Sequence, residues 1–368
     1  MSWRSILFLL CLLCLSSGCF QPDSIPPSIT PLSTDTTVHP ISHSFLFEES
    51  RVTIDVPVDM GVYRGAQQSN KRIYLYRDLP DSEWYPIYYT AFIDDPHQDP
   101  FFQDLISALR SVRSDLRLDD DRYLELCSVF VQSLPYDDDT VLIEPKFPIE
   151  TYGDGTGDCD DKSLLLAGIL SREGYDVALL LYLEEKHMAI GIRGDGCSDV
   201  GDGYSYLETT RAHFVGVVPD RLAGNVTISS TPIIIPVGDG TLGYGACLET
   251  RALFDLLSYC RDQVDELNAQ MDRERVVLEG MKEEIAARQS SMELLRSQGR
   301  YTEYNHQVAG FNAEIERYND RLRRYNELVR EAERYVGIHT TILDRMYDRH
   351  GLYRQMERIG ILAEMRGR

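Results

Sequence analysis

The pattern of apolar and polar residues predicts β-strands near the start of the chain and helices after them. Between about Phe45 and Tyr89 apolar and polar residues alternate and aromatic residues are frequent, which is typical of strands. From Phe101 to Leu109 and from Tyr123 to Leu134 the apolar residues recur at helical spacing, and the second run follows the acidic cap Asp119–Asp121. The clearest strand candidates in the first region are Arg72–Tyr76 and Trp84–Tyr89.

A further helix and three further strands are predicted in the centre of the chain. The apolar run from Ser163 predicts a helix that Gly174 ends. Three strands follow, at Asp176–Leu183, His187–Arg193 and Tyr204–Thr209. A helix packed on antiparallel strands is an α+β arrangement, so we expect residues 41–250 to form an α+β domain.

Two long seams of apolar residues occupy the chain beyond Thr250. Within each seam successive members are three or four residues apart, and the glycine-containing segment Ser297–Arg300 separates the two seams. We therefore predict an antiparallel helical hairpin, a coiled coil, over residues 251–336 and a short helical tail over residues 337–368. A parallel dimeric coiled coil is the alternative. The first seam is Leu257, Cys260, Val264, Leu267, Met271, Leu278, Met281, Ile285, Met292 and Leu295, with Glu274 and Arg288 as polar members; the second is Tyr304, Val308, Phe311, Ile315, Tyr318, Leu322, Tyr325 and Val329.

The N-terminus has the features of an export signal. Arg4 precedes the uncharged stretch Ile6–Leu15, which is too short to span a bilayer comfortably. Gly18-Cys19 resembles the lipobox of prokaryotic lipoproteins, in which the cysteine becomes the lipidated first residue. We predict a signal peptide over residues 1–19 with lipidation at Cys19; an uncleaved anchor and ordinary cleavage are the alternatives. In each case we expect the remainder outside the cytoplasm, tethered to a membrane by a Pro/Ser/Thr-rich linker over residues 20–40.

The charge of the chain is acidic and uneven. The formal net charge is −22, and residues 41–250 contain 36 acidic against 16 basic residues, whereas residues 251–368 contain 21 against 20. An acidic surface argues against nucleic acid or anionic lipid as the partner of the central domain. Binding of cationic ligands is one explanation of the acidic surface. An acidic surface that is simply solvated is the explanation we favour.

Five cysteines follow the N-terminal region, and one of them stands in a polar setting. No CxxC motif occurs, which argues against a zinc ribbon or a thioredoxin motif. Outside the cytoplasm a pair such as Cys197 and Cys247 is compatible with a disulfide, although the sequence leaves the pairing open. Cys127 and Cys260 fit equally well as buried apolar residues on helices. Cys159 lies where a Gly/Asp-rich loop meets an apolar helix.

Cys159, His187 and Glu208 are the candidate catalytic residues. A thiol needs a base to act as a nucleophile, and the base needs a third group to orient it. His187 opens one predicted strand and Glu208 lies in another, where an unpaired carboxylate is costly. Asp199 and Asp202, in a Gly-rich loop, are weaker candidates for the third group. The helix start at Cys159 favours its thiolate and offers the Cys159 N–H as the first oxyanion donor.

No cofactor or metal is predicted. Asp154, Asp158 and Asp160 suggest a calcium loop, but the glycine and the final glutamate that an EF-hand needs are replaced by Cys159 and Leu165. A metal site built on Cys159 and His187 is a minor alternative.

Three motifs in the same order resemble the transglutaminase-like superfamily of papain-type cysteine enzymes. They are Gly157–Ser163 (GDCDDKS), Lys186–Gly191 (KHMAIG) and Tyr206–Thr210 (YLETT), and the resemblance covers about Tyr123 to Pro219. It implies a papain-like core with a triad at Cys159, His187 and Glu208, and acyl transfer on amides: peptide hydrolysis or transfer of a glutamine acyl group to an amine. The family's third residue is usually aspartate, which Glu208 replaces here.

These observations lead to two hypotheses from different classes. The first is a membrane-tethered, extracytoplasmic cysteine protease, amide hydrolase or acyltransferase that acts on a protein or peptide through a thioester. The second is a catalytically inactive transglutaminase-like module of the cell envelope that binds a protein partner through the coiled-coil hairpin.

Overall fold

The computed structural model describes residues 23–137, 144–194, 196–197, 199–222 and 226–367. The predicted signal peptide and the lipidation site Cys19 lie outside this range. The chain divides into two compact units, one ending at Cys247 and the other beginning at Leu248. Within the described ranges, no helix combines the length and the apolar character that crossing a bilayer requires.

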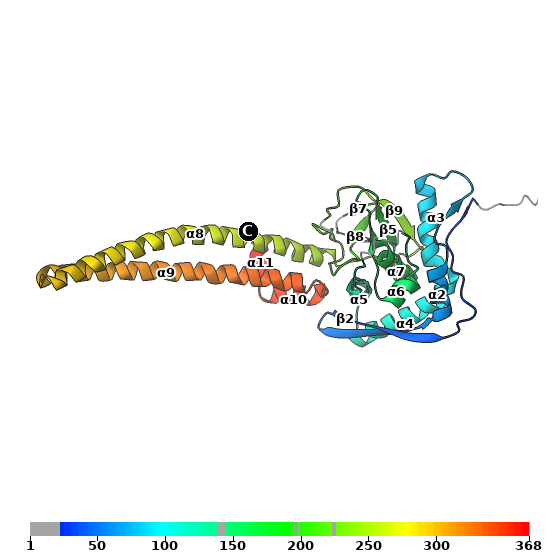
Figure 1. Ribbon diagram of the computed structural model, residues 1–368, viewed down its shortest axis with the longest axis horizontal. Helices are drawn as coiled ribbons and strands as arrows, with labels where there is room; N and C mark the ends of the chain where they lie inside the picture. Colours follow the sequence, from blue (N-terminus) through cyan, green and yellow to red (C-terminus); the bar gives the residue numbers. More distant parts are fainter. Residues whose placement is uncertain (1–22, 138–143, 195, 198, 223–225, 368) are drawn as a thin grey trace, which may run out of the picture. The chain divides into compact units, whose positions relative to one another are not determined.

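A five-stranded antiparallel sheet lies at the centre of the first unit (Figure 1). The strand order is β7-β8-β6-β5-β9, so β5 and β6 are flanked on both sides and every residue of β5 is buried. The mixed α+β class is therefore confirmed. Three of the strands match the predicted segments, whereas β7 and β9 were not predicted. The strands are β5 (Val177–Tyr182), β6 (His187–Arg193), β7 (Asp199–Gly201), β8 (Tyr204–Leu207) and β9 (Ile233–Val237).

Helix α7 (Cys159–Arg172) packs on β5 and β6 and carries the candidate nucleophile. Its N-cap is Asp158, whose side chain accepts hydrogen bonds from the backbone N–H groups of Asp160 and Asp161. The helix stops where Gly174 takes a positive φ of 83°. Four other helices also contact α7, so its apolar run is buried on several sides; they are α3 (Asp81–Asp94), α4 (Asp99–Leu116), α5 (Asp120–Ser133) and α6 (Pro148–Asp154).

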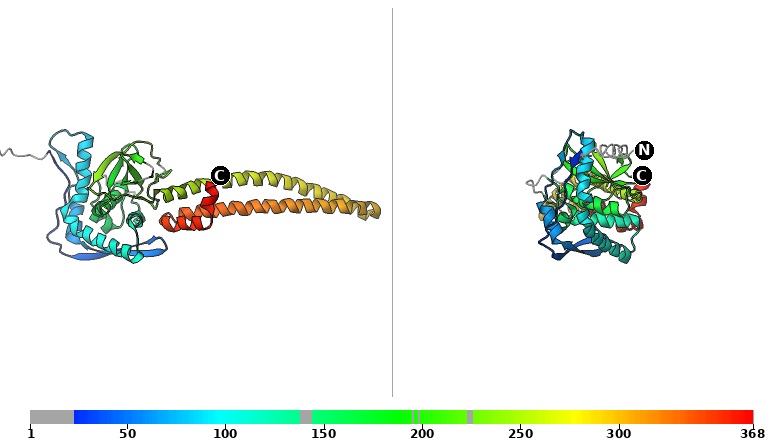
Figure 2. Two further views of the ribbon diagram at one scale, coloured as in Figure 1. Left: turned by 180° about the vertical axis from the view of Figure 1, so that it is seen from behind. Right: turned by 90° about the vertical axis from the view of Figure 1, so that its right-hand side faces the viewer.

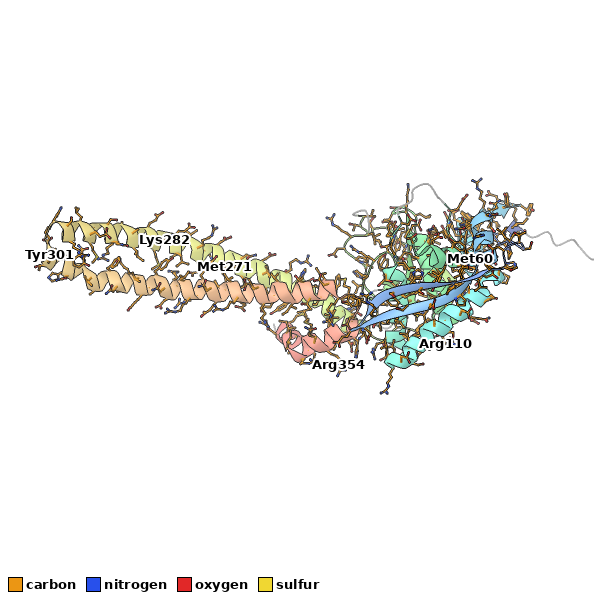
Figure 3. All side chains as sticks on the ribbon, turned by 60° about the horizontal axis from the view of Figure 1, so that its bottom comes forward. Met60, Arg110, Met271, Lys282, Tyr301 and Arg354 are labelled. Atoms are coloured by element: carbon orange, nitrogen blue, oxygen red, sulfur yellow. A yellow bond between two sulfur atoms is a disulfide. The ribbon has the colours of Figure 1, made fainter. Side chains whose placement is uncertain are left out.

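A long hairpin of β2 (Val38–Phe47) and β3 (Ser50–Asp59) lies along helix α4 (Asp99–Leu116), which carries Arg110 (Figure 3). Along β3 buried and exposed residues alternate, because one face of the strand packs on the helix. The predicted strand character is confirmed for residues 45–47 and 50–59, whereas residues 60–68, predicted to belong to the same strand region, form a helix. The helix predicted at residues 101–109 is confirmed. The remaining short elements are β1 (Ser24–Ile25), α2 (Met60–Gln68), β4 (Tyr74–Leu75) and a 3-10 helix at Pro96–Gln98.

The prediction of a strand at Trp84–Tyr89 is wrong, since this segment belongs to helix α3. Trp84, Tyr88 and Phe92 recur every four residues and contact one another, with ring centroids 6.1 Å and 5.2 Å apart. The dense aromatic composition resembles that of a strand, but this four-residue spacing is that of a helix face. The strand expected at Arg72–Tyr76 is reduced to the two residues of β4.

The Pro/Ser/Thr-rich segment differs from the extended linker expected of it. Ile29 is 2% exposed, and its backbone N–H donates to the carboxylate of Asp95 over 2.8 Å. Strand β2 already begins at Val38. The segment from about residue 24 onward is therefore part of the first unit.

The second unit is built on two long antiparallel helices, α8 (Cys247–Ser297) and α9 (Tyr301–Asp344), joined at Gly299, which has a φ of 74° (Figure 2). All members of both predicted seams are buried or partly buried. The polar seam residue Glu274 accepts a hydrogen bond from Arg321 of the facing helix over 2.6 Å, and Arg288 pairs with Glu314. The chain thus forms an intramolecular hairpin.

The C-terminal tail forms two helices in place of the single one predicted. Helix α9 continues to Asp344, and α10 (Arg349–Arg358) and α11 (Ile361–Arg366) follow. Gly360, with a φ of 76°, separates them, and each buries apolar side chains: Leu352 and Met356 on α10, Ile361 and Leu362 on α11. The glycine explains the break, because its left-handed backbone ends a helix.

Cys197 and Cys247 form a disulfide, with their Cα atoms 4.9 Å apart. Gly216 leaves room for it, since a Cβ at this position would lie 2.4 Å from the Cys197 sulfur. Cys127 and Cys260, for which the sequence left a disulfide and a buried apolar role open, are free and buried.

Replacing both disulfide cysteines by serine is expected to lower the free energy of unfolding of the first unit by about 2–4 kcal/mol. The bond closes a segment of 50 residues, and its loss frees the unfolded chain. Urea unfolding followed by the fluorescence of Trp84 measures this unit. A reductant should destabilise the wild type and leave the variant unchanged; equal stability of the two proteins under oxidising conditions would contradict this role.

Candidate active site

The three candidate catalytic residues lie on neighbouring elements of the first unit. Cys159 is the first residue of α7, His187 is the first residue of β6, and Glu208 directly follows β8. Strand β8 pairs with β6, and α7 packs on β6. Cys159 is partly exposed, His187 is 7% exposed and Glu208 is 0% exposed. The nucleophile candidate is thus the member that solvent reaches best.

The sulfur of Cys159 lies against the backbone on both sides of His187. Sγ is 4.0 Å from the carbonyl oxygen of Lys186, and the backbone N–H of Met188 stabilises the thiolate. The backbone N–H of Cys159 itself, at the first position of α7, has no hydrogen-bond partner among the described residues. That group is free to stabilise a negative oxygen next to the sulfur.

The hydrogen bonds of His187 fix which ring nitrogen carries the proton. Nε2 lies 3.0 Å from the hydroxyl oxygen of Tyr206 and 3.6 Å from Oε2 of Glu208. The Tyr206 hydroxyl donates its only proton to that Oε2 over 2.6 Å, so it accepts from His187. Nε2 therefore carries the hydrogen, and Nδ1 is the ring nitrogen with a free lone pair.

The carboxylate of Glu208 is fully buried and richly hydrogen-bonded. Oε1 accepts from the backbone N–H groups of Thr209 and Thr210, over 3.0 and 2.8 Å, and from the Thr210 hydroxyl over 2.6 Å. Burial raises the pKa of this carboxyl, but His187, Thr210 and Tyr206 outweigh burial and hold the pKa at about 2. Glu208 is therefore ionised at neutral pH.

The thiol of Cys159 stands in an environment that opposes its ionisation. Burial raises the pKa of the thiol most, and the carboxylates of Asp160 and Asp158 raise it further. The expected stabilisation of the thiolate by the helix start is therefore outweighed by burial and, after it, by these acidic neighbours. The resting residue is a thiol, and it needs a base to become a nucleophile.

Buried polar residues hold the segment that carries Glu208. Lys162, which is 0% exposed, donates to the carbonyl oxygens of Gln132, Leu134 and Thr210 over 3.4, 2.8 and 3.2 Å. Burial lowers the pKa of this amine to about 8. Ser163 contacts the hydroxyl of Thr209 over 3.1 Å, and the Gln132 amide donates to the carbonyl oxygen of Glu208 over 2.7 Å. These contacts join α5, α7 and residues 208–210.

One group of three potential metal ligands comes together in the described ranges of the chain: Asp158, Asp160 and Asp161, with ligand atoms within 4.8 Å of one another. These carboxylates already accept backbone hydrogen bonds. Asp158 caps α7, and Asp161 accepts from the N–H of Lys146 over 2.6 Å. We assign them to the capping of the helix.

Sequence reasoning proposed Cys159, His187 and Glu208, which the fold brings onto neighbouring elements, but it did not identify Tyr206, Lys162 and Gln132. A signal for Tyr206 was present, because residues two apart on a strand share a face, and Tyr206 precedes Glu208 by two. Lys162 and Gln132 act through carbonyl oxygens, which leave no pattern in the sequence. Of the candidates for the third group, Glu208 lies beside His187, with its Oε2 3.6 Å from Nε2. The backbone of Asp199 lies on β7, and Asp202 lies in the turn that follows.

Comparisons with protein-family models, with curated proteins and with solved structures find no match to this chain. The function is therefore inferred from the geometry and the chemistry of the site.

Replacing Glu208 by glutamine is expected to make the free energy of unfolding less dependent on acidic pH. Its pKa is about 2 in the folded protein against an ordinary value of 4.5, so the carboxylate stabilises the fold above about pH 4.5 and this contribution disappears as the pH falls towards 2. Between about pH 5 and about pH 3 the wild type should lose about 2 kcal/mol more unfolding free energy than Glu208→Gln.

Urea unfolding at both pH values measures the difference. Glu184→Gln is the matched control, because Glu184 is exposed in the turn before β6. The control should retain the wild-type pH dependence. Parallel pH dependence in the wild type and in Glu208→Gln would contradict a buried, ionised Glu208.

Proposed function

We propose that this chain is a cysteine-dependent amide hydrolase or acyltransferase with a transglutaminase-like, papain-type core. Cys159 is the nucleophile, His187 the general base and acid, and Glu208 the group that keeps His187 oriented. The observation that carries the proposal is the hydrogen bonding of His187: Nε2 is engaged by the Tyr206 hydroxyl, which itself donates to Glu208, so the basic Nδ1 remains for the thiol. The contacts of the Cys159 sulfur with the backbone beside His187 support it.

The reaction follows from these roles. His187 Nδ1 takes the proton of the Cys159 thiol as the sulfur attacks the carbonyl carbon of an amide, and the Cys159 N–H stabilises the oxygen that becomes negative. The C–N bond then breaks, and His187 returns the proton to the leaving amine. Water or a primary amine next attacks the thioester, and His187 takes its proton and passes it to the departing sulfur. Glu208 stays ionised throughout.

The proposed setting is outside the cytoplasm. The N-terminal residues 1–19 would export the chain and hold it at a membrane, through lipid on Cys19 or an uncleaved anchor. The disulfide between Cys197 and Cys247 supports an oxidising compartment. The substrate is a protein or peptide, and the helical hairpin is a surface for a protein partner.

A second candidate is a binding module without turnover. The raised pKa of the Cys159 thiol favours it, since a protein that needs no thiolate can tolerate Asp158 and Asp160 beside the sulfur. In that case the helical hairpin would carry the function as an envelope adaptor.

Acylation by an activated ester separates the two candidates without knowledge of the natural substrate. The full chain is mixed with a p-nitrophenyl ester of a short N-acyl peptide, and the burst of nitrophenol is followed. Mass mapping should place the acyl group on Cys159. His187→Ala should slow acylation by roughly 10²- to 10⁴-fold, because the thiol loses its general base.

His306→Ala, in an exposed position on α9, is the control and should acylate like the wild type. A primary amine added after acylation shows whether water or the amine resolves the thioester faster. Acyl groups found elsewhere than on Cys159, or equal rates in the wild type and His187→Ala, would overturn the enzyme proposal in favour of the binding module.

A further inference from the structure

Tyr206 stands between the imidazole of His187 and the carboxylate of Glu208. Its hydroxyl oxygen is 3.0 Å from Nε2 and 2.6 Å from Oε2, whereas Nε2 and Oε2 are 3.6 Å apart. The last distance exceeds the range of an N–H···O hydrogen bond. The carboxylate therefore reaches the imidazole through the tyrosine hydroxyl.

The Tyr206 hydroxyl has one proton, and this fixes which group donates in its hydrogen bonds with His187 and Glu208. Glu208 is an ionised acceptor, so the hydroxyl proton of Tyr206 points to it. Burial and the neighbouring Glu208 carboxylate raise the pKa of Tyr206, which keeps that proton on the hydroxyl. The lone pairs of the hydroxyl are left for the N–H of His187 Nε2. The chain of donors thus runs from His187 to Tyr206 to Glu208.

The position of the hydroxyl is set by the sheet. Tyr206 is 0% exposed and lies opposite Gly191 of β6 in the register of the two strands. Its ring packs with Leu180, Tyr182 and Ala189 in a buried cluster. Its carbonyl oxygen accepts from the N–H of Gly216 over 2.8 Å. A side chain confined in this way holds its hydroxyl in one place.

We propose that Tyr206 is a positioning residue that links His187 to Glu208, so that the site is a relay of four residues, Cys159, His187, Tyr206 and Glu208, in place of a triad. Tyr206 sets the tautomer of His187 by accepting from Nε2, and Glu208 sets the orientation of the Tyr206 hydroxyl. This inference rests on the proposed function for its kinetic consequence, but its structural part, the tautomer of His187, is measurable without turnover.

The test compares Tyr206→Phe with Tyr182→Phe in the full chain. Tyr182 is the matched control: it is buried in the same sheet, its ring lies 6.5 Å from that of His187, and among the described residues its hydroxyl makes no hydrogen bond. Each variant loses one hydroxyl from a ring near His187. Only Tyr206→Phe removes the acceptor of Nε2–H.

The first measurement is the ¹⁵N NMR spectrum of the His187 ring, assigned by its loss in His187→Ala. The wild type and Tyr182→Phe should show one tautomer with the hydrogen on Nε2. Tyr206→Phe should show a mixture of the two tautomers, because among the described residues only the Tyr206 hydroxyl lies within hydrogen-bond range of Nε2, and Oε2 of Glu208 is 3.6 Å away. An unchanged spectrum in Tyr206→Phe would overturn the proposal, since Glu208 would then orient His187 alone.

The second measurement is the pH profile of Cys159 acylation. Tyr206→Phe should acylate roughly 10- to 100-fold more slowly than Tyr182→Phe, with a displaced pH profile, because fewer molecules carry a basic Nδ1. Equal rates and equal profiles would contradict the kinetic role. If the wild type is not acylated at Cys159, the proposed function fails, and the NMR spectra still decide the role of Tyr206.

Discussion

The ionised carboxylate of Glu208, buried without any solvent contact, is the constraint on which the site depends. A charge in this position is costly unless donors surround it, and the structure supplies Tyr206, the two backbone N–H groups of residues 209 and 210, and the Thr210 hydroxyl. Each donor has to be held in place. Strand β8 holds Tyr206, and the contacts of Lys162, Ser163 and Gln132 hold the segment that follows. Residues of α7 thus hold the donors that stabilise the Glu208 carboxylate, so the buried charge depends on the packing of α7 on the sheet.

The same constraint assigns the roles of the other residues. Because the carboxylate engages Nε2 of His187 through Tyr206, the basic nitrogen is Nδ1. Cys159 meets a different environment at the partly exposed start of α7, where Asp158 caps the helix and Asp160 is adjacent. These carboxylates stabilise the helix but raise the pKa of the thiol. A site of this kind keeps its cysteine protonated at rest and depends on the base for activation, which suits an oxidising environment where exposed thiolates react readily.

The elements next to the site were predictable from sequence because their signals are local. The short apolar run of β6, the Gly174 stop of α7 and the Asp119 cap of α5 all lie within a few residues of the structure they specify. The segment Trp84–Tyr89 was predicted as a strand because it is rich in aromatic residues, although their four-residue spacing is that of a helix. Lys162, which bonds three carbonyl oxygens of distant segments, has no local signal. The apolar seams of the hairpin could be predicted from the sequence because a coiled coil repeats the same contacts at regular intervals along the chain.

The dependence of Cys159 on His187 is the central claim, and the pH dependence of alkylation tests it most directly. The rate of iodoacetamide addition to Cys159 is measured by mass spectrometry in the full chain and in His187→Ala, from acid to strongly alkaline pH. Reaction near neutral pH in the wild type, and in His187→Ala only at alkaline pH where the thiol ionises unaided, is the predicted result. Coincident profiles for the two proteins would show that His187 does not serve as the base of Cys159 and would contradict the account.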